Sequence, residues 1–243
     1  MINILFGKRR FWLILAAVVL LLVGSMLLFT IYFAPKDPYG IYEQAMVAQK
    51  RLKSFECMQT ATQKTKDIGQ NESQTDSKMK YSTVTKINYR KVNGLSTYKV
   101  KTVLSDIDIG TTTYCDGKQI IDVTKSGIAS VAERKPQKTP WFLYINFDKK
   151  FLKKQNVQIE NGSKIVELVF DGQKMLESSP ALSESFNVDE FVITSKIDKG
   201  GLITEINQKS IYSNNCTMQY YSEVNYVYSN INENEDFVIP QIN

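Results

Sequence analysis

Residues 83–104 read Thr-Val-Thr-Lys-Ile-Asn-Tyr-Arg-Lys-Val-Asn-Gly-Leu-Ser-Thr-Tyr-Lys-Val-Lys-Thr-Val-Leu, and this stretch decides the fold. Asn93-Gly94 lies between two runs of alternating side chains, which is the strongest short-range signal for a two-residue β-hairpin turn. The cross-strand pairs that follow from this turn are Val92 with Leu95, Tyr89 with Tyr98, Ile87 with Val100 and Thr83 with Leu104. Four basic side chains fall on the other face: Lys86, Arg90, Lys99 and Lys101. Turn chemistry and alternation therefore predict the same antiparallel hairpin.

Similar turn signals recur along the chain. Asp116-Gly117 sets residues 111–115 against residues 118–124, and Asn161-Gly162 pairs Val157 with Val166. A turn at Lys199-Gly200 would pair Ile197 with Leu202 and Ile193 with Ile206, with a slip of one residue left open. A long final strand carries one face of six residues: Cys216, Met218, Tyr220, Val224, Tyr226 and Tyr228. Four hairpins joined in sequence predict a mostly antiparallel sheet.

Few segments show helical spacing. Residues 38–53 follow a good N-cap, Asp37, and predict an amphipathic helix whose apolar stripe is Ile41, Ala45, Ala48 and Leu52. At Ser54 the period changes from 3.6 to 2 and predicts a strand, followed by a polar loop over residues 64–78. Residues 141–152 predict a short helix, broken around Asn146, and residues 172–187 predict a helical turn or a lid-like loop.

A long sheet with one apolar face must bury that face, and this chain offers few helices to cover it. The fold class predicted is therefore α+β: an N-terminal transmembrane helix followed by a strongly curved antiparallel sheet, an unclosed half-barrel with a few covering helices. A sandwich of two sheets is the alternative.

Residues 11–34 contain no charge. At about 1.5 Å per residue, a helix of this length crosses a hydrocarbon core of roughly 30 Å. Lys8, Arg9 and Arg10 precede the segment, so the positive-inside rule places residues 1–10 in the cytoplasm and residues 35–243 outside the cell. The predicted organisation is a cytoplasmic tail (1–10), a membrane anchor (11–34), a linker (35–37) and one extracytoplasmic domain (38–243). A cleaved signal peptide is the alternative.

Composition excludes several classes of function. The chain has no His, which removes His-based general bases, Ser-His-Asp nucleophiles and HExxH metal sites. Its three Cys residues are far apart, form no CxxC pair and leave the disulfide state open. Of 30 Lys and Arg, three precede the anchor, which leaves 27 against 25 acids and gives no electrostatic footprint for nucleic acid. We therefore predict no catalytic residue, no metal and no cofactor.

Aromatic side chains gather on the apolar faces of these strands. Tyrosine offers an apolar ring with a polar tip, which suits a pocket for lipid-like ligands. Ordinary cross-strand packing is the alternative for each residue taken alone. The predicted ligand-binding set is Tyr81, Ile87, Tyr89, Tyr98, Val100, Leu104, Trp141, Phe142, Tyr220, Tyr226 and Tyr228.

From residue 38 to residue 240 the order of elements resembles the lipoprotein-carrier fold of the LolA/LppX type. The segments that carry the resemblance are Leu52-Lys53-Ser54-Phe55, the hairpin Tyr114-Cys115-Asp116-Gly117-Lys118-Gln119-Ile120, residues 195–203 and Phe237-Val238-Ile239-Pro240. The resemblance implies an unclosed barrel with helices at its mouth and a cavity for acyl chains. Members are carriers, lipid-binding lipoproteins or periplasmic sensor domains. Here a membrane helix replaces the lipidated Cys of many relatives, which puts a shuttling role in doubt.

Two functions follow as hypotheses. The first is a membrane-anchored extracytoplasmic domain that binds a lipid, a lipoprotein or another amphiphile without covalent chemistry. The second is a protein–protein sensor or assembly module of a cell-envelope complex, with no small ligand. Low Pro, plentiful Lys, Asn and Ile, and the anchor are typical of a Gram-positive bacterium with an AT-rich genome.

Overall fold

Alternating side chains and tight turns give this chain one large sheet. The computed structural model describes residues 37–67, 79–104, 107–137, 140, 142, 145, 147–177, 186–214, 218–233 and 237–240. The predicted anchor (11–34) and most of the predicted loop (64–78) lie outside these residues. Pro38–Asn243 is a compact unit by itself. Within the described part of the chain, no helix has the length and apolar character needed to span a bilayer.

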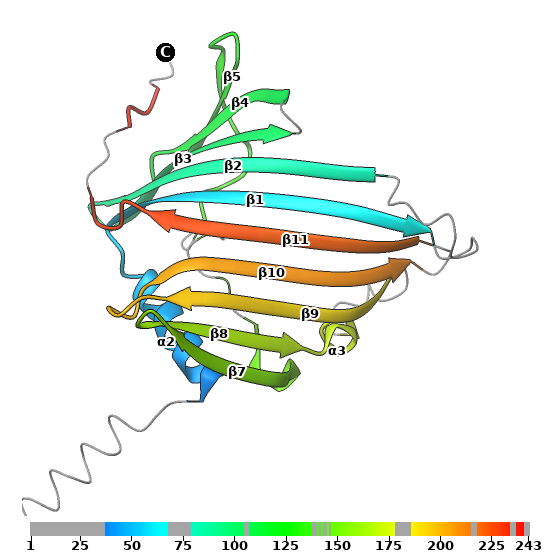
Figure 1. Ribbon diagram of the computed structural model, residues 1–243. Coiled ribbons are helices and arrows are strands. Elements are labelled where there is room, and N and C mark those ends of the chain that lie inside the picture. Colours follow the sequence, from blue (N-terminus) through cyan, green and yellow to red (C-terminus); the bar gives the residue numbers. More distant parts are fainter. Residues whose placement is uncertain are drawn as a thin grey trace, which may run out of the picture. The chain divides into compact units, whose positions relative to one another are not determined.

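The eleven strands formed by the described residues belong to a single antiparallel sheet (Figure 1). They are β1 (Ser54–Asp67), β2 (Met79–Val92), β3 (Leu95–Leu104), β4 (Ile107–Cys115), β5 (Ile120–Thr124), β6 (Ala129–Val131), β7 (Leu152–Glu160), β8 (Ser163–Phe170), β9 (Phe186–Ile197), β10 (Ile203–Asn214) and β11 (Met218–Ser229). Their order is β6-β5-β4-β3-β2-β1-β11-β10-β9-β8-β7, so the first and last strands pair in the middle. A linear order with free ends at β6 and β7 confirms the unclosed sheet and is inconsistent with a two-sheet sandwich.

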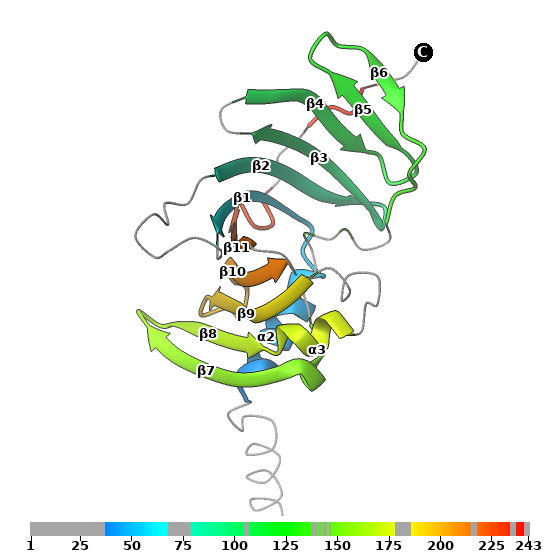
Figure 2. The ribbon, with the colours of Figure 1, turned by 90° about the vertical axis from the view of Figure 1, so that its right-hand side faces the viewer.

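The sheet curls strongly around its covering elements (Figure 2). These are α2 (Pro38–Gln49), the 3₁₀ turn η3 (Lys149–Phe151) and α3 (Gly172–Glu177). The last of these confirms the helical turn expected after residue 172; residues 178–185 lie outside the described ranges. α2 contacts β7, β8, β9 and β10, so it covers only one half of the sheet's inner face.

Two hairpin registers agree with the sequence prediction in every pair. Val92 lies opposite Leu95 and Tyr89 opposite Tyr98 in one hairpin, and Val157 lies opposite Val166 in the other. The central residues of each turn have positive φ, at 50° and 81° for Asn93-Gly94 and at 50° and 78° for Asn161-Gly162. Positive φ at both positions is the type I′ geometry that Asn-Gly favours.

The other two turns are longer than predicted. Asp198 closes a loop in which its N–H donates to the Leu202 carbonyl at 2.9 Å and its Oδ1 accepts from the Leu202 N–H at 2.8 Å. Gly201 rather than Gly200 takes the positive φ, and Ile197 pairs with Ile203, which is the slip of one residue left open. Beyond a bulge Ile206 pairs with Ser195, so the predicted pairing of Ile206 with Ile193 was wrong. Asp116 likewise accepts from two N–H groups in its loop, and β5 begins at Ile120 rather than at residue 118.

Three element boundaries also differ from the prediction. β1 runs on to Asp67, because residues 64–67 still pair with β11 and residues 64 and 65 also pair with β2. α2 ends at Gln49 rather than at residue 53, and Leu152 begins β7 rather than ending a helix. The buried face of α2 is also rotated from the predicted stripe; it consists of Tyr39, Tyr42, Ala45, Met46 and Gln49. Of the predicted stripe, Ala45 belongs to this buried face and Leu52 is buried beyond the end of the helix, whereas Ile41 and Ala48 are only partly buried.

The core lies between the inner face of the sheet and its covering elements. On β8–β10 the side chains of Val166, Leu168, Phe170, Ile193 and Ile206 are fully buried. The core continues across β11, β1 and β2 through buried side chains that include Tyr226, Tyr228, Phe55, Cys57, Ile87 and Tyr89. Cys57 and Cys115 are buried free thiols, and Cys216 lies outside the described residues.

Candidate functional site

The described residues between Pro140 and Phe151, which we call the strap, close the inner face of the sheet. Three tyrosine hydroxyls hold the strap by its backbone. Tyr39 donates to the Phe147 carbonyl at 2.7 Å, Tyr228 donates to the Phe142 carbonyl at 3.0 Å, and Tyr42 donates to the Ile145 carbonyl. These donors come from α2 and β11, so the strap is tied to elements far apart in sequence. Buried carbonyls left without such donors would be costly.

Phe142 packs the strap against the sheet, and its side chain is 1% exposed. Its ring lies edge-on to three aromatic rings, with centroid distances of 6.1 Å to Phe55, 6.0 Å to Tyr89 and 5.4 Å to Tyr98. Edge-to-face packing at these distances is favourable beyond the area that it buries. Phe142 therefore packs into the concavity among these rings, and a cavity lies beside it, toward β3–β5.

The cavity beside Phe142 has a volume of about 340 Å³. Its lining comes from β3–β5, the strap and the segment before the strap: Tyr98, Val100, Thr113, Ile120, Arg134, Lys135, Gln137, Pro140 and Phe142. Aromatic and aliphatic side chains form most of the floor, whereas the two cationic residues follow each other on one segment. The volume lies within the range of pockets that bind small ligands, roughly 300–1,000 Å³.

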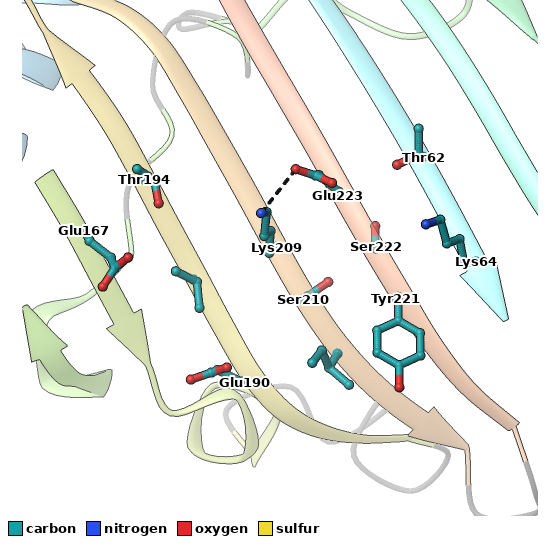
Figure 3. A pocket seen from close by; sticks show the side chains of 12 residues that line it. Thr62, Lys64, Glu167, Glu190, Thr194, Lys209, Ser210, Tyr221, Ser222 and Glu223 are labelled. Atoms are coloured by element: carbon teal, nitrogen blue, oxygen red, sulfur yellow. Dashed lines mark ion pairs between the residues drawn. The ribbon is translucent and has the colours of Figure 1, made fainter. Parts of the chain in front are cut away.

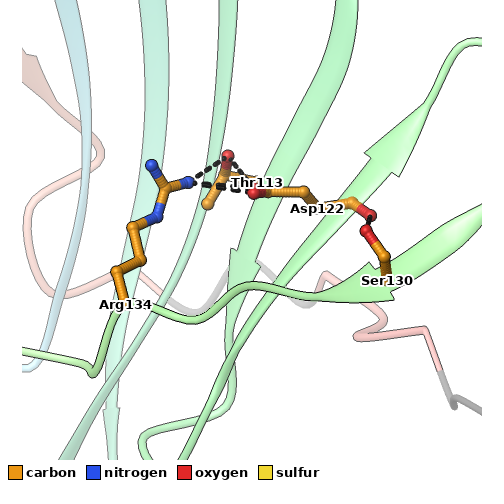
Figure 4. Close-up of polar contacts among 4 residues, drawn as sticks. All are labelled: Thr113, Asp122, Ser130 and Arg134. Atoms are coloured by element: carbon orange, nitrogen blue, oxygen red, sulfur yellow. Dashed lines mark hydrogen bonds and ion pairs between the residues drawn. The ribbon is translucent and has the colours of Figure 1, made fainter.

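The cationic rim is oriented by one carboxylate (Figure 4). Arg134 Nη2 lies 2.9 Å from Asp122 Oδ1 and 3.3 Å from Thr113 Oγ1, and Thr113 Oγ1 donates to Asp122 Oδ1 at 2.6 Å. Lys135 is exposed and makes no ion pair with another described residue. The rim thus presents a guanidinium whose charge is balanced by Asp122 and an ammonium that is free to meet an anion.

Tyr98 supplies a polar hydroxyl at the floor. Burial, with a further contribution from the neighbouring Cys115 thiol, raises the pKa of Tyr98 to about 12. The hydroxyl is therefore neutral at physiological pH and can donate or accept a hydrogen bond. Burial also raises the pKa of Cys115, so this thiol is neutral and unsuited to nucleophilic chemistry.

The structure divides the predicted ligand-binding residues among four places. Tyr98, Val100 and Phe142 line the cavity. A second group, buried in the core, comprises Ile87, Tyr89, Tyr226 and Tyr228. Leu104 is half-buried at the far end of β3, and Tyr220 stacks on Tyr212 at a centroid distance of 4.9 Å. The side chains of Tyr81 and Trp141 lie outside the described residues.

Sequence reasoning missed part of the lining, namely Thr113, Ile120, Arg134, Lys135, Gln137 and Pro140. The parity of the hairpin at Asp116-Gly117 could have found Thr113 and Ile120, because both lie on strands of a recognisable hairpin. The residues between β6 and the strap carry no periodic pattern. The sequence signal in that segment that could have indicated a binding residue is the Arg134-Lys135 pair, which is followed by Pro136 and Pro140.

Two other hollows have different chemistry. On the opposite face of β8–β11 and β1, a hollow of about 350 Å³ is lined mainly by charged and hydroxyl-bearing residues, and Lys209 pairs with Glu223 at 3.5 Å inside it (Figure 3). A smaller apolar hollow of about 260 Å³ lies between α3 and β9–β10, where Met175, Phe191 and Tyr212 contribute. Of these three hollows, the cavity beside Phe142 is the one that combines an apolar floor with an ammonium, Lys135, that forms no ion pair with another described residue.

In the described part of the chain, no three Cys, Asp or Glu residues gather closely enough to hold a metal ion.

No family model matches the chain, and no curated protein matches it in sequence. Solved structures do. LprF from Mycobacterium bovis is 13% identical with a TM-score of 0.42, and the match covers 84% of this chain and 96% of LprF. A LolA superfamily protein, NE2245 from Nitrosomonas europaea, is 8% identical with a TM-score of 0.30, covering 80% and 94%. MucB, solved in complex with MucA(peri), is 7% identical with a TM-score of 0.15, covering 77% and 92%.

These likenesses concern the fold alone. The described topology is itself the one that the LolA/LppX resemblance implies: one unclosed antiparallel sheet with helices on its inner face. The chain therefore has a LolA/LppX-like fold.

Proposed function

We propose that this chain is a membrane-anchored extracytoplasmic binding domain that holds an anionic amphiphile, such as a fatty acid or an acidic lipid, in the cavity beside Phe142. The observation that carries the proposal is the combination in one cavity of an apolar floor with the cationic rim of Arg134 and Lys135. An acyl chain would lie against Tyr98 and Val100, and its acidic group would reach Lys135. No covalent step is required.

The energetics favour this class of ligand. Each methylene moved from water to an apolar wall contributes about 0.8 kcal/mol. The acidic group of the ligand would pair with the Lys135 ammonium at the rim, so the negative charge would not be buried without a partner. A neutral apolar ligand would gain only the first of these contributions, and an anion without a chain only the second.

The first test is native mass spectrometry of the isolated domain (residues 36–243), which retains the whole compact unit, followed by organic extraction and uptake of a fluorescent fatty acid. We expect one bound acyl species per domain. Val100→Glu should abolish uptake, because it places an acid on the apolar floor. The control is Val131→Glu, at a position on β6 that is 52% exposed and should bind as the wild type does.

The rim is tested by charge reversal. Lys135→Glu should weaken binding of the fatty acid at least tenfold and leave binding of an uncharged glyceride unchanged. Lys125→Glu, an equal change of charge in the β5–β6 turn, is the matched control. A clean apo mass with no uptake by the wild type would refute the proposal and favour a protein–protein module of the cell envelope.

A further inference from the structure

The edge strand β7 is long and open. It ends the sheet at Leu152–Glu160, and all its residues from Lys153 onward are exposed. Ile159 is 77% exposed and Val157 is 36% exposed. The opposite edge, β6, has only three residues. Proteins usually shorten, cover or bend such edges because their unpaired backbone groups invite another strand.

The β7–β8 hairpin fixes which backbone groups face outward. Its type I′ turn makes Glu160 and Ser163 exchange both hydrogen bonds, and hydrogen-bonded pairs alternate from there along the antiparallel ladder. The N–H and C=O groups of residues 156, 158 and 160 are therefore turned toward β8. Those of Gln155, Val157 and Ile159 point away from the sheet and are open to a new strand.

We propose that β7 pairs antiparallel with β7 of a second copy of this chain, about a two-fold axis that passes through Val157. The outward groups of residues 155, 157 and 159 then meet the same three residues of the second copy, so the backbone pairing is complete on both sides. Such an isologous contact uses one patch twice and closes as a dimer.

The side chains fit this register on both faces. Val157 shares the inner face with its buried neighbour Val166, so the two copies of Val157 meet there, with Ile159 across from Gln155 of the second copy. On the outer face Lys154 comes opposite Glu160, and symmetry repeats that pair. Opposite charges directly across two strands are favourable. Neither residue forms an ion pair with another described residue.

Neighbouring registers lose this match. An axis at Asn156 would place Lys154 opposite Gln158, and an axis at Gln158 would place it opposite Gly162, so both charge pairs disappear. The bulge between Leu152 and Lys154 ends the regular strand at its other side, which limits the pairing to residues 154–160.

The register is tested by cysteine crosslinking of the full chain in membranes of an expressing bacterium, with copper phenanthroline as oxidant. Val157→Cys should give a disulfide-linked dimer, because paired residues in such a ladder have Cα atoms about 5.5 Å apart. Ile159→Cys should not link to itself, because the two copies of residue 159 are four positions out of register. Ile159→Cys mixed with Gln155→Cys should link.

The role of the edge is tested by proline substitution and light scattering of the full chain in mild detergent. The Val157 N–H points outward, so Val157→Pro removes no bond to β8 and should leave the fold intact while raising the dimer dissociation constant at least tenfold. Asn156→Pro removes a ladder bond and serves as the control for damage to the fold.

Charge exchange provides a third readout. Lys154→Glu and Glu160→Lys should each weaken the dimer, and the double variant should restore it, because the exchanged pairs meet again across the axis. A monomeric wild type that gives no Val157→Cys crosslink would overturn the proposal. So would a dimer of unchanged affinity in the Val157→Pro variant, since the contact would then lie elsewhere.

Discussion

The two halves of the inner face show what a covering helix does to a curved sheet. On β7–β10, α2 presses Tyr42 and Met46 against side chains that are 0% exposed, such as Leu168 and Ile193. On β2–β5 no described helix lies over the strands; Phe142 and the irregular segment before it lie there instead, and Tyr98 and Val100 stay half-buried beside a cavity. Both halves belong to one sheet with the same alternation. The position of α2, rather than the strands themselves, decides which half is core and which half can bind.

The largest expected effect is a difference between the two halves in how much unfolding free energy a core substitution removes. Phe170→Ala removes a fully buried ring from the helix-covered half, where Phe147 and Phe191 pack around it, and should cost about 4 kcal/mol of unfolding free energy. Val100→Ala, beside the cavity, should cost about 1 kcal/mol or less, because its side chain is only partly removed from water. Urea unfolding of both variants measures the contrast. Equal costs would mean that the open half is packed as tightly as the covered one.

The sequence predicted the strands better than it predicted which elements cover the inner face of the sheet. Asn-Gly turns demand positive φ at two positions, so Asn93-Gly94 and Asn161-Gly162 set their registers locally, and every predicted pair is present. The loop after Ile197 depends on an aspartate side chain that caps a longer turn, and a rule for two-residue turns cannot see that bond. A turn can be predicted from the sequence when its own residues require a particular backbone conformation.

Which elements cover the inner face of the sheet depends on tertiary contacts and was harder to predict from the sequence. The spacing of apolar residues predicted a buried face of α2 that is rotated from the observed one. Tyr39 and Tyr42 turn inward, and their hydroxyls donate to carbonyls of the strap. Those carbonyls lie more than a hundred residues away in the chain. The same holds for the cavity. Tyr98 and Val100 were predicted from the hairpin strand that carries them, and Phe142 from its aromatic character. Arg134 and Lys135 join them only through the path of an irregular segment.

A second effect comes from the centre of the sheet and depends on pH. Burial raises the pKa of Cys57 from 9.0 to about 12. The folded thiol keeps its proton where the unfolded thiol releases it, so its contribution to stability is complete below pH 9 and is lost as the pH rises from 9 toward 12. The loss is about 1.4 kcal/mol per pH unit, or about 2 kcal/mol between pH 9 and pH 10.5.

Urea unfolding at pH 8.5 and pH 10.5 measures this loss, and Cys57→Ala should reduce the pH dependence between the two. Buried tyrosines contribute the rest, because burial raises the pKa of Tyr226, for example, to about 12. Burial also raises the pKa of Cys115, whose thiol lies in the open half, so Cys115→Ala is the informative comparison. We expect it to flatten the dependence less than Cys57→Ala does. The reverse ranking would show that the open half excludes water better than the centre of the sheet.

The smallest effect has the opposite sign and lies beneath the helix. The side chain of Gln49 is 0% exposed, and neither its amide nitrogen nor its amide oxygen has a hydrogen-bond partner among the described residues. A buried polar group without a partner loses the free energy of its hydration without compensation. Gln49→Met keeps a similar length and removes that cost, so it should stabilise the domain by about 1–2 kcal/mol in urea unfolding.

Gln44→Met, at an exposed position on the same helix, controls for the gain in helix propensity and should change stability by less than about 0.5 kcal/mol. If Gln49→Met stabilises the domain and fatty-acid uptake is unchanged, the tight half is only a scaffold for the open one. If uptake falls while stability rises, binding requires α2 to loosen from the sheet. The contrast between a rigid half and an open half would then hold only for the molecule without a ligand. A destabilised Gln49→Met variant would show instead that the amide has partners under the helix.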